Sequence, residues 1–359
     1  MPDLGPLSLI LLVVYGVLVL VPLANLFLMR RPRGRGSASS MIILIPARNE
    51  AENLRQLVPA LVGQGATVLV FNDESEDDTQ QVAAAAGATV LSAAEPLPEG
   101  WTGKNRACHM LALAAAETSP AEWIVFLDAD AVPEPDFVSR LAGLLESISP
   151  AVRVVSGMPR LLSGKGPEPI YLSWVPWMIL ATIPFGLISR SRLGHPRFLN
   201  GQMVCWRART YAEIWPHREL SGAVLEDVGI GRLLARRGIR VEIADLAPIL
   251  SVRMYADFRQ ALDGMSKNAV FIAGSSAATI VVALMCAALA WGWLLMGASL
   301  LWGLGMLWLS KRITDRLCRI PIWVWPFAPL TLTLAGFTFL RSLVWRAKGQ
   351  IRWKGRVYR

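Results

Sequence analysis

The chain has 359 residues, 53% of them hydrophobic, and a formal net charge of +9. Its mean hydropathy of +0.42 is too high for a simple soluble enzyme. Four cysteines without a Cys-x-x-Cys pair predict no disulfide framework, and the basic residues form no motif interleaved with aromatic residues, so we expect no nucleic-acid partner.

The first predicted element is a membrane helix over residues 7–28. This stretch is apolar and long enough for the roughly 20 residues that one crossing needs. Asp3 precedes it, and four arginines follow it: Arg30, Arg31, Arg33 and Arg35. Positive residues stay on the cytoplasmic side, so the chain after the helix is predicted to be cytoplasmic. A cleaved signal peptide needs basic residues before its apolar core, and we therefore expect an uncleaved anchor.

Three short apolar runs come next, and each ends in polar residues. They cover residues 41–46, 66–71 and 123–127, and are followed by ARNE, NDES and DAD. An amphipathic segment comes after each run, at 50–61, 77–86 and 136–146. This alternation is typical of βαβ units and predicts a mostly parallel sheet.

The carboxyl ends of parallel strands share one edge of a sheet, and ligands bind beyond that edge. We therefore expect Asp73, Asp128 and Asp130 to converge on one crevice. Two acids one residue apart can hold a divalent cation together with the oxygens of a diphosphate. A solvated acidic turn is the alternative for any one strand, but three such turns at the same edge are not expected.

Five motifs extend this pattern: ILIPARNEAENL, FNDESEDDT, GWTGKNRACHMLA, FLDADAVPEPDF and LEDVGIGRLLARRG. In this order they resemble the nucleotide-sugar domain of family 2 glycosyltransferases, which has the GT-A fold. The resemblance covers roughly residues 41–268. Within the family the chain looks closest to membrane-anchored enzymes that glycosylate lipids, such as ceramide glucosyltransferase and the carotenoid and hopanoid-associated groups.

The resemblance implies a nucleoside diphosphate sugar as the donor, usually UDP-linked in this family. Asp73 lies where the family's uracil- and ribose-contacting acid lies. The opposite wall of that site is then formed by Pro46, Arg48 and Glu50.

Asp128 and Asp130 match the family's Asp-x-Asp pair. The resemblance makes Asp130 the direct ligand of Mg²⁺ or Mn²⁺ and places Asp128 nearer the ribose and the sugar. Lys104 opens a predicted helix, and a helix N-terminus with an ammonium group suits a phosphate contact. An ordinary solvated lysine is the alternative for Lys104.

Glu226 and Asp227 precede a predicted helix over residues 228–237. Acids at this place can be simple capping and dipole residues. The resemblance instead makes Asp227 the general base that removes the proton of the acceptor hydroxyl. One displacement inverts the anomeric carbon, so an α-linked donor is expected to give a β-glycoside.

Asn200 and Gly201 resemble the acceptor side of the family's site. His217 precedes the acidic pair at a spacing seen in lipid glycosyltransferases, although a surface loop histidine is the alternative. The Gln-x-x-Arg-Trp signature of processive polysaccharide synthases is absent from the sequence. Lys267, followed by Asn268, stands in its place and offers a cation to the diphosphate. This departure weakens a polymer-synthase interpretation.

Residues 170–188 are nearly long enough to cross a membrane, but Pro176 and Pro184 interrupt them. We interpret them as an interfacial segment with Trp174 and Trp177 at the headgroup level, guiding a lipid acceptor toward Asp227. A buried core helix is the alternative.

Residues 269–309 are long enough for two membrane crossings with a turn near 291–293. A basic flank of Lys311, Arg312, Arg316 and Arg319 follows and is predicted to be cytoplasmic. An apolar stretch over 321–340 comes next and contains Pro321, Pro326 and Pro329. A single crossing there would leave the basic tail outside, against the charge rule. A re-entrant hairpin would keep the tail inside, and we favour it slightly.

The predicted architecture is an α/β chain in three parts: an N-terminal membrane anchor over residues 1–36, a cytosolic GT-A domain over 37–268 and C-terminal membrane or re-entrant helices over 269–359. The predicted function is that of a multi-pass plasma-membrane, metal-dependent, inverting hexosyltransferase acting on a lipid such as a carotenoid, hopanoid, sterol-like lipid or sphingolipid. Anionic lipid headgroups are expected at the basic flanks. A polyprenyl-phosphate glycosyltransferase, a polysaccharide synthase and an inactive membrane scaffold are the alternatives.

Overall fold

The computed structural model describes residues 5–164, 166–190, 198–255 and 257–348, together with 352–353 and 356–357. The chain forms two compact units. The first, here called the sheet unit, comprises Met29–Arg160 and Ile188–Arg253. The second, the helical unit, comprises Met1–Leu28, Leu161–Leu187 and Met254–Arg359. Residues 161–187, placed by the sequence within the GT-A domain, thus group with the apolar helices.

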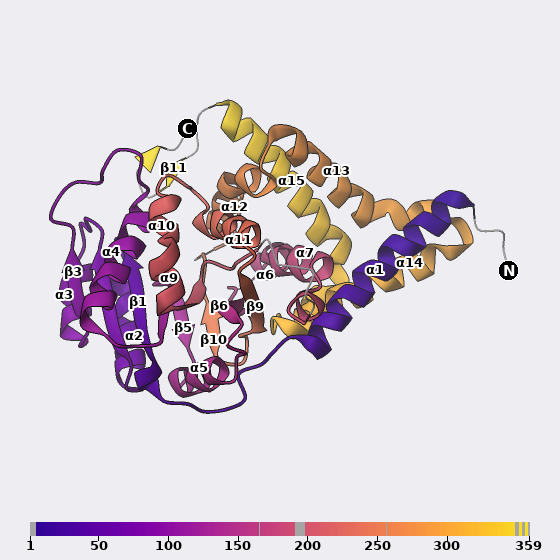
Figure 1. Ribbon diagram of the computed structural model, residues 1–359. Coiled ribbons are helices and arrows are strands. Elements are labelled where there is room, and N and C mark those ends of the chain that lie inside the picture. Colours follow the sequence, from indigo (N-terminus) through magenta and orange to yellow (C-terminus); the bar gives the residue numbers. More distant parts are fainter. Residues whose placement is uncertain are drawn as a thin grey trace. The chain divides into compact units, whose positions relative to one another are not determined.

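Within the described residues, a seven-stranded sheet forms the centre of the sheet unit, in the order β3-β2-β1-β4-β8-β6-β9 (Figure 1). The strands are β1 (Met41–Ala47), β2 (Thr67–Asn72), β3 (Thr89–Ser92), β4 (Trp123–Leu127), β6 (Val152–Met158), β8 (Met203–Arg207) and β9 (Arg240–Asp245). β1 runs parallel to β2 and β4, whereas β8 is antiparallel to both of its neighbours. The predicted mostly parallel sheet of an α/β fold is confirmed.

Helices follow the strands as the sequence pattern predicts. They are α2 (Ala51–Val62), α3 (Thr79–Ala85), α4 (Gly103–Thr118), α5 (Phe137–Glu146), α9 (Ala208–Ile214), α10 (Pro216–Glu219) and α11 (Glu226–Arg236). Two short antiparallel strands, β5 (Ala131–Pro133) and β10 (Leu250–Val252), lie outside the main sheet. Thr102 caps α4, because its hydroxyl accepts a hydrogen bond from the backbone N–H of Asn105.

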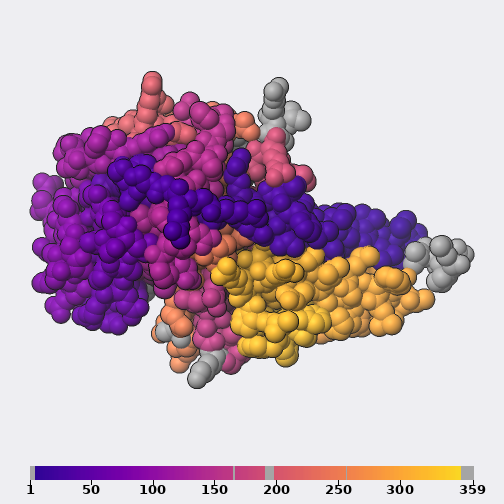
Figure 2. All heavy atoms as spheres, turned by 90° about the horizontal axis from the view of Figure 1, so that it is seen from below, coloured from indigo at the N-terminus to yellow at the C-terminus, as the bar shows by residue number. Residues whose placement is uncertain are grey.

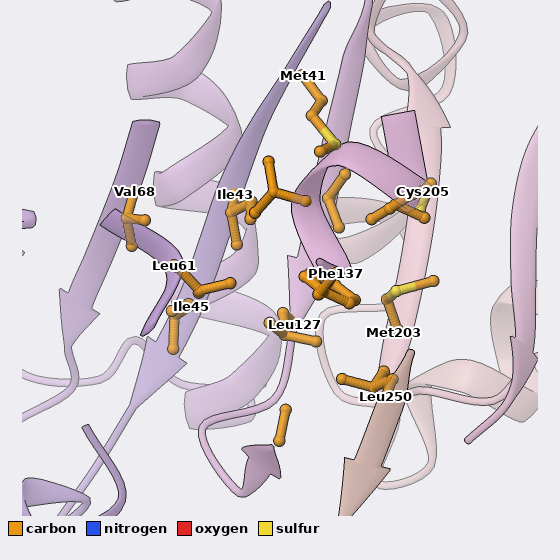
Figure 3. Close-up of a cluster of buried hydrophobic side chains, with 14 of the residues drawn as sticks. Met41, Ile43, Ile45, Leu61, Val68, Leu127, Phe137, Met203, Cys205 and Leu250 are labelled. Carbon is orange, nitrogen blue, oxygen red and sulfur yellow. The ribbon is translucent and has the colours of Figure 1, made fainter. Parts of the chain in front are cut away.

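The main core lies on one face of this sheet. Alternate residues of β1, namely Met41, Ile43 and Ile45, point into it and meet Phe137 of α5 and Leu61 of α2 (Figure 3). A one-residue slip of a strand would turn these side chains to the opposite face. The core therefore fixes the strand register, and with it the position of the loops at the carboxyl ends of the strands.

The basic segment after the first helix is part of the sheet unit. The Arg31 guanidinium donates a hydrogen bond to the Asp245 carboxylate at 2.9 Å, and the backbone N–H of Asp245 donates to the Arg30 carbonyl at 2.8 Å. Arg30 also lies 3.7 Å from the carboxylate of Glu242. These two arginines, expected to face anionic lipid, are engaged by acids at the end of β9.

The helical unit contains α1 (Pro6–Leu28), α6 (Glu168–Leu172), α7 (Trp174–Thr182), α8 (Phe185–Ile188), α12 (Phe258–Ala273), α13 (Ser276–Trp291), α14 (Leu300–Leu317) and α15 (Ala328–Ala347). Short 3₁₀ segments, η2 (Gly292–Ser299) and η3 (Ile322–Phe327), precede α14 and α15, and β11 (Arg352–Trp353) pairs with β12 (Arg356–Val357). α1 packs along α14, as the indigo and orange spheres show (Figure 2).

Within the described residues, four helical stretches are long and apolar enough to cross a membrane: Pro6–Leu28, Glu168–Ile188, Ser276–Leu317 and Ile322–Ala347. The third is divided by η2, which agrees with the predicted turn near residues 291–293. The re-entrant hairpin favoured for residues 321–340 is wrong, because α15 is one continuous helix of 20 residues. Pro326 precedes this helix and Pro329 lies at its start, where a missing N–H costs no hydrogen bond.

Trp174 and Trp177, predicted to lie at the headgroup level, pack inside the protein, as in the buried-helix alternative. Their side chains are buried among the helices of the helical unit, with exposed fractions of 3% and 2%. The Trp177 indole N–H donates a hydrogen bond to the Ser310 hydroxyl of α14 at 3.0 Å. A buried tryptophan needs such a partner for its N–H, and α14 supplies it.

Candidate active site

One pocket of the sheet unit lies where β1 and β4 end and α4 and α11 begin. It holds about 340 Å³ of empty space, open solvent included. Its lining consists of Pro46, Lys104, Cys108, Phe126, Asp128, Gly201, Val204, Trp206, His217, Glu226, Asp227 and Ile230. Seven of the predicted site residues are in this lining: Pro46, Lys104, Asp128, Gly201, His217, Glu226 and Asp227.

Lys104 joins two acids of this pocket. Its ammonium nitrogen lies 2.8 Å from Asp128 Oδ1 and 2.7 Å from Glu226 Oε1. Burial opposes the positive charge, but the carboxylates of Asp128 and Glu226 outweigh it and raise the pKa of Lys104 well above its ordinary value. Lys104 is therefore a fixed cation in the pocket, and not the solvated lysine that was the alternative.

Asp227 is held by the backbone on both carboxylate oxygens. Oδ2 accepts a hydrogen bond from the N–H of Gly201 at 3.3 Å, and Oδ1 accepts one from the N–H of Val228 at 2.8 Å. Burial, and then the neighbouring charge of Glu226, raise the pKa of Asp227 to about 6. The N-cap of α11 is Leu225, so Asp227 does not cap this helix. An oriented carboxylate with such a pKa can accept a proton near neutral pH.

Asp130 lies beside Asp128 in the loop after β4. Its Oδ1 is buried and has no hydrogen-bond partner among the residues that the structure describes. Burial and the charge of Asp128 raise the pKa of Asp130 to about 7. A buried carboxylate oxygen without a donor beside a second carboxylate fits a divalent cation, which prefers oxygen ligands. The described protein residues form no group of three or more ligands, so oxygens of a substrate would have to complete the coordination.

Asp73 belongs to a neighbouring cluster at the end of β2. The guanidinium of Arg106 on α4 pairs with the Asp73 carboxylate and lies 2.9 Å from a carboxylate oxygen of Glu74. Arg48 donates a hydrogen bond to the Asp73 carbonyl at 3.0 Å. Asp73 and Arg48, predicted to flank the nucleotide, are thus brought together. Burial raises the pKa of Asp128, and the charges of Glu226 and Glu50 add to this effect.

Sequence reasoning missed Arg106. It stands two residues after Lys104 in the same motif, GWTGKNRACHMLA, and so faces a different direction from the first turn of α4. The available signal was a buried acid at Asp73, since a buried carboxylate needs a charged or hydrogen-bonding partner. The sequence alone does not indicate which of its arginines is that partner.

Three of the predicted acceptor-side residues lie near Asp227 within the sheet unit: Asn200, Gly201 and His217. The Asn200 side chain is hydrogen-bonded to Gln202, in the turn that presents the Gly201 N–H. His217 is buried in the pocket wall, and its Nδ1 lies 2.7 Å from the Tyr211 hydroxyl. Burial and then the charge of Lys104 lower the pKa of His217 to about 3, so this imidazole is neutral. Lys267 on α12 and Trp177 on α7 belong to the helical unit, and their predicted substrate contacts stay predictions.

Residues 42–187 match the family described as Glycosyl transferase family 2. A curated relative, 4,4'-diaponeurosporenoate glycosyltransferase of Staphylococcus aureus strain USA300, is 24% identical over 250 residues, which cover 68% of this chain and 65% of the relative. The protein of strain MRSA252 matches to the same extent. The match therefore spans slightly less than two thirds of these relatives.

Two solved structures of glucosyl-3-phosphoglycerate synthase from Mycobacterium tuberculosis are also similar to the chain. One, in complex with Mn²⁺, UDP and phosphoglyceric acid, is 21% identical, with a TM-score of 0.41, and the match covers 72% of this chain and 80% of that one. The other, with Mn²⁺, UDP and glucosyl-3-phosphoglycerate, is 22% identical, with a TM-score of 0.40, covering 65% and 76%.

The family match extends over the strands and helices that carry Pro46, Asp73, Lys104, Asp128 and Asp130. These residues belong to a glycosyltransferase family 2 domain. This match bears out the predicted resemblance over residues 42–187, and the helical stretches on either side of it in the sequence are long and apolar enough to cross a membrane.

Proposed function

We propose that this protein transfers a hexose from a nucleoside diphosphate sugar, UDP-linked, to a lipid acceptor, with inversion of the anomeric carbon. The single observation that carries the proposal is the pocket that brings Lys104 and Asp128 together with Asp227. A cation suited to a diphosphate and a carboxylate suited to a proton thus line the same space.

The proposed donor side comprises the ends of β1 and β4, which line the pocket, and the neighbouring cluster at the end of β2. Asp73, Arg48, Pro46 and Glu50 are the residues proposed to contact the nucleoside. Lys104 meets the diphosphate, because an ammonium at the first turn of a helix is a favourable position for an anion. Glu226 and Asp128 hold this ammonium in place before the donor binds.

Asp130, together with Asp128, would hold Mg²⁺ or Mn²⁺, for which its buried Oδ1 is suited. When bound, such an ion offsets the negative charge that develops on the leaving diphosphate. Lys104 contributes in the same direction from the other side of Asp128. Lys267 is a further candidate cation for the diphosphate.

Asp227 is the proposed general base. It removes the proton from the acceptor hydroxyl while that oxygen attacks the anomeric carbon, and the sugar–phosphate bond breaks on the opposite side. The backbone N–H groups of Gly201 and Val228 hold the carboxylate in one orientation for this transfer. General-base catalysis of this kind typically contributes about 10²–10⁴-fold. Asn200 and His217 are proposed to serve the acceptor, whereas Trp177 is enclosed within the helical unit.

A lipid acceptor is supported by the four stretches able to cross a membrane, since an apolar acceptor is dissolved there. The relatives named as diaponeurosporenoate glycosyltransferases support an apolar, carotenoid-like acceptor. The plasma membrane, with the sheet unit on its cytoplasmic side, is the proposed location, because arginines follow α1.

The test is transfer by the purified protein in lipid bilayers, with radiolabelled UDP-glucose, UDP-galactose and UDP-GlcNAc and with Mg²⁺ or Mn²⁺. We expect metal-dependent label in the organic phase, lost in Asp130→Ala and Asp227→Ala. Glu213→Ala is the matched control, because this exposed acid of α9 is outside the pocket lining. Label in a water-soluble polymer or in a phosphate-linked lipid would overturn the proposed acceptor, and absence of turnover with any donor would overturn the proposed enzyme.

A further inference from the structure

Asn105, the third residue of α4, binds the loop that leads into α11. Its side chain is fully buried, with 0% exposed. The amide nitrogen Nδ2 lies 2.8 Å from the Leu220 carbonyl, 3.0 Å from that of Ser221 and 3.1 Å from that of Ala223. Three carbonyl oxygens can only face the NH₂ group of this amide, so its orientation is determined by the contacts.

The same loop is bound to the residues before α4. The backbone N–H of Thr102 donates to the Ser221 carbonyl at 2.8 Å. Gly222 lies so close to the neighbouring loop that a Cβ added to it would be 3.0 Å from the Gly100 carbonyl oxygen. The start of α4 and the residues before α11 are therefore in direct backbone contact.

α11 has no side-chain cap of its own, since its N-cap is Leu225. The position of its first turn consequently depends on the loop before it. That turn carries Glu226, which is bound by Lys104, and Asp227. Two consecutive residues of α4 thus hold the beginning of α11. The Lys104 side chain binds the side chain of Glu226, and the Asn105 side chain binds backbone carbonyls of the preceding loop.

Asn105 itself is not part of the pocket lining. Its Oδ1 is buried and finds no donor within the described part of the chain, so donation to the loop is the observed function of the side chain. The Nδ2 amide group has two N–H donors, and the three carbonyl oxygens share them. Replacement of Asn105 would remove the side-chain donor that these partly buried carbonyls share. The Ser221 and Leu220 carbonyls would keep the backbone N–H groups of Thr102 and Ala223, respectively.

We infer that Asn105 is a positioning residue for Asp227, and this inference rests on the proposed function. It holds the loop 220–223 in place. This loop in turn positions the Asp227 carboxylate, which removes the proton of the acceptor hydroxyl. A displacement of about 1 Å in a reacting group can reduce the rate by about 10²-fold. Lys104 keeps its contact with Asp128, which lies outside the loop, so donor binding should change less than transfer when Asn105 is replaced.

The test compares Asn105→Ala with wild type in the bilayer assay, with kcat expressed per UDP-binding site so that unfolded protein does not count. We expect kcat to fall about 10- to 100-fold and the donor KM to change less than about threefold. The ratio of sugar released to water over sugar transferred to lipid rises, because water reaches the anomeric carbon without a well-placed base.

The matched control is Gln64→Ala. The Gln64 amide also donates to backbone carbonyls, those of Ala60 and Glu134, but it is remote from the pocket lining. We expect a lower melting temperature without a change in the hydrolysis-to-transfer ratio. Asn105→Ser keeps one hydroxyl donor, so its kcat and its hydrolysis-to-transfer ratio should lie between those of wild type and Asn105→Ala. If the alanine variant does not fold, the serine variant is compared with wild type instead.

A kcat and a ratio within twofold of wild type in Asn105→Ala would overturn the inference, as would an equal rise of the ratio in Gln64→Ala. If the wild type transfers no sugar, the proposed function fails separately. Hydrogen exchange then decides on Asn105, because its replacement must still accelerate exchange in residues 220–228, and unchanged exchange refutes the role.

Discussion

The ammonium group of Lys104 lies 2.7 Å from a carboxylate oxygen of Glu226, 122 positions later in the chain. This pair connects the first turn of α4 with the first turn of α11. The same ammonium reaches Asp128 at 2.8 Å, so one cation links the proposed donor side to the proposed catalytic helix. A bound diphosphate would meet Lys104 at the point where these elements converge.

Replacement of Lys104 by methionine should therefore weaken donor binding. The variant loses a charge-assisted hydrogen bond, which contributes about 1.5–3 kcal/mol and corresponds to a 10- to 100-fold weaker Kd for UDP. It also leaves Asp128 and Glu226 close together without their cation. Calorimetric titration with UDP checks the prediction, and an unchanged Kd would contradict the assignment of Lys104 to the diphosphate.

The rate should depend on pH through Asp227. Its pKa is raised to about 6, so the base form predominates above pH 6 and is lost as the pH falls below it. The free energy of unfolding changes with pH in the opposite direction to the rate. The folded state binds the Asp227 proton more tightly than the unfolded chain does, so the contribution of Asp227 to stability falls as the pH rises from about 4 to 6. We expect kcat/KM, which reports the free enzyme, to fall tenfold per pH unit below pH 6. A kcat/KM that stays level down to pH 5 would exclude Asp227 as the base.

Arg106 should be needed for stability as well as for nucleotide binding. It pairs with the buried carboxylate of Asp73, and removal of one partner of a buried pair costs about 3–5 kcal/mol. We expect Arg106→Leu to lower the melting temperature strongly and to weaken UDP binding. Arg209→Ala is the control, because its pair with Glu213 is exposed and contributes about 0–1 kcal/mol. Equal effects of the two variants would show that the Asp73 pair is not important.

Lys311 and Asp315 form a fully buried ion pair within α14. The sequence places Lys311 in a basic flank, but the structure encloses it with Trp177 and Ser310. We expect Lys311→Met alone to destabilise the protein in detergent, because Asp315 stays buried without its partner. Lys311→Met with Asp315→Leu should restore most of the melting temperature, since a buried pair and apolar residues of similar volume are often equivalent. A double variant as unstable as the single one would refute this.

Much of the sheet unit was predictable from local sequence. Apolar runs of five or six residues ended by polar residues are typical of buried parallel strands, and β1, β2 and β4 lie where these runs predict them. The acids after these strands were also identified from the sequence. What it did not indicate was the pairing of α4 with α11, because the contacts of Lys104 and Asn105 join residues more than 100 positions apart.

The helical unit was predicted less well, for a physical reason. Composition indicates that a segment is apolar, but it does not distinguish a membrane interface from the inside of a helix bundle. Trp177 and Lys311 were therefore placed at a boundary, whereas helix packing buries both. Pro326 and Pro329 predicted an interruption, but their position at the beginning of α15 makes them compatible with a continuous helix.

The anomeric configuration of the product is the most direct test of the account. A single displacement with Asp227 as the base converts an α-linked sugar nucleotide into a β-glycoside. The glycolipid formed from UDP-glucose should therefore show the anomeric proton coupling of a β-linked sugar in NMR spectra. An α-linked product would contradict a single displacement and with it the role of Asp227.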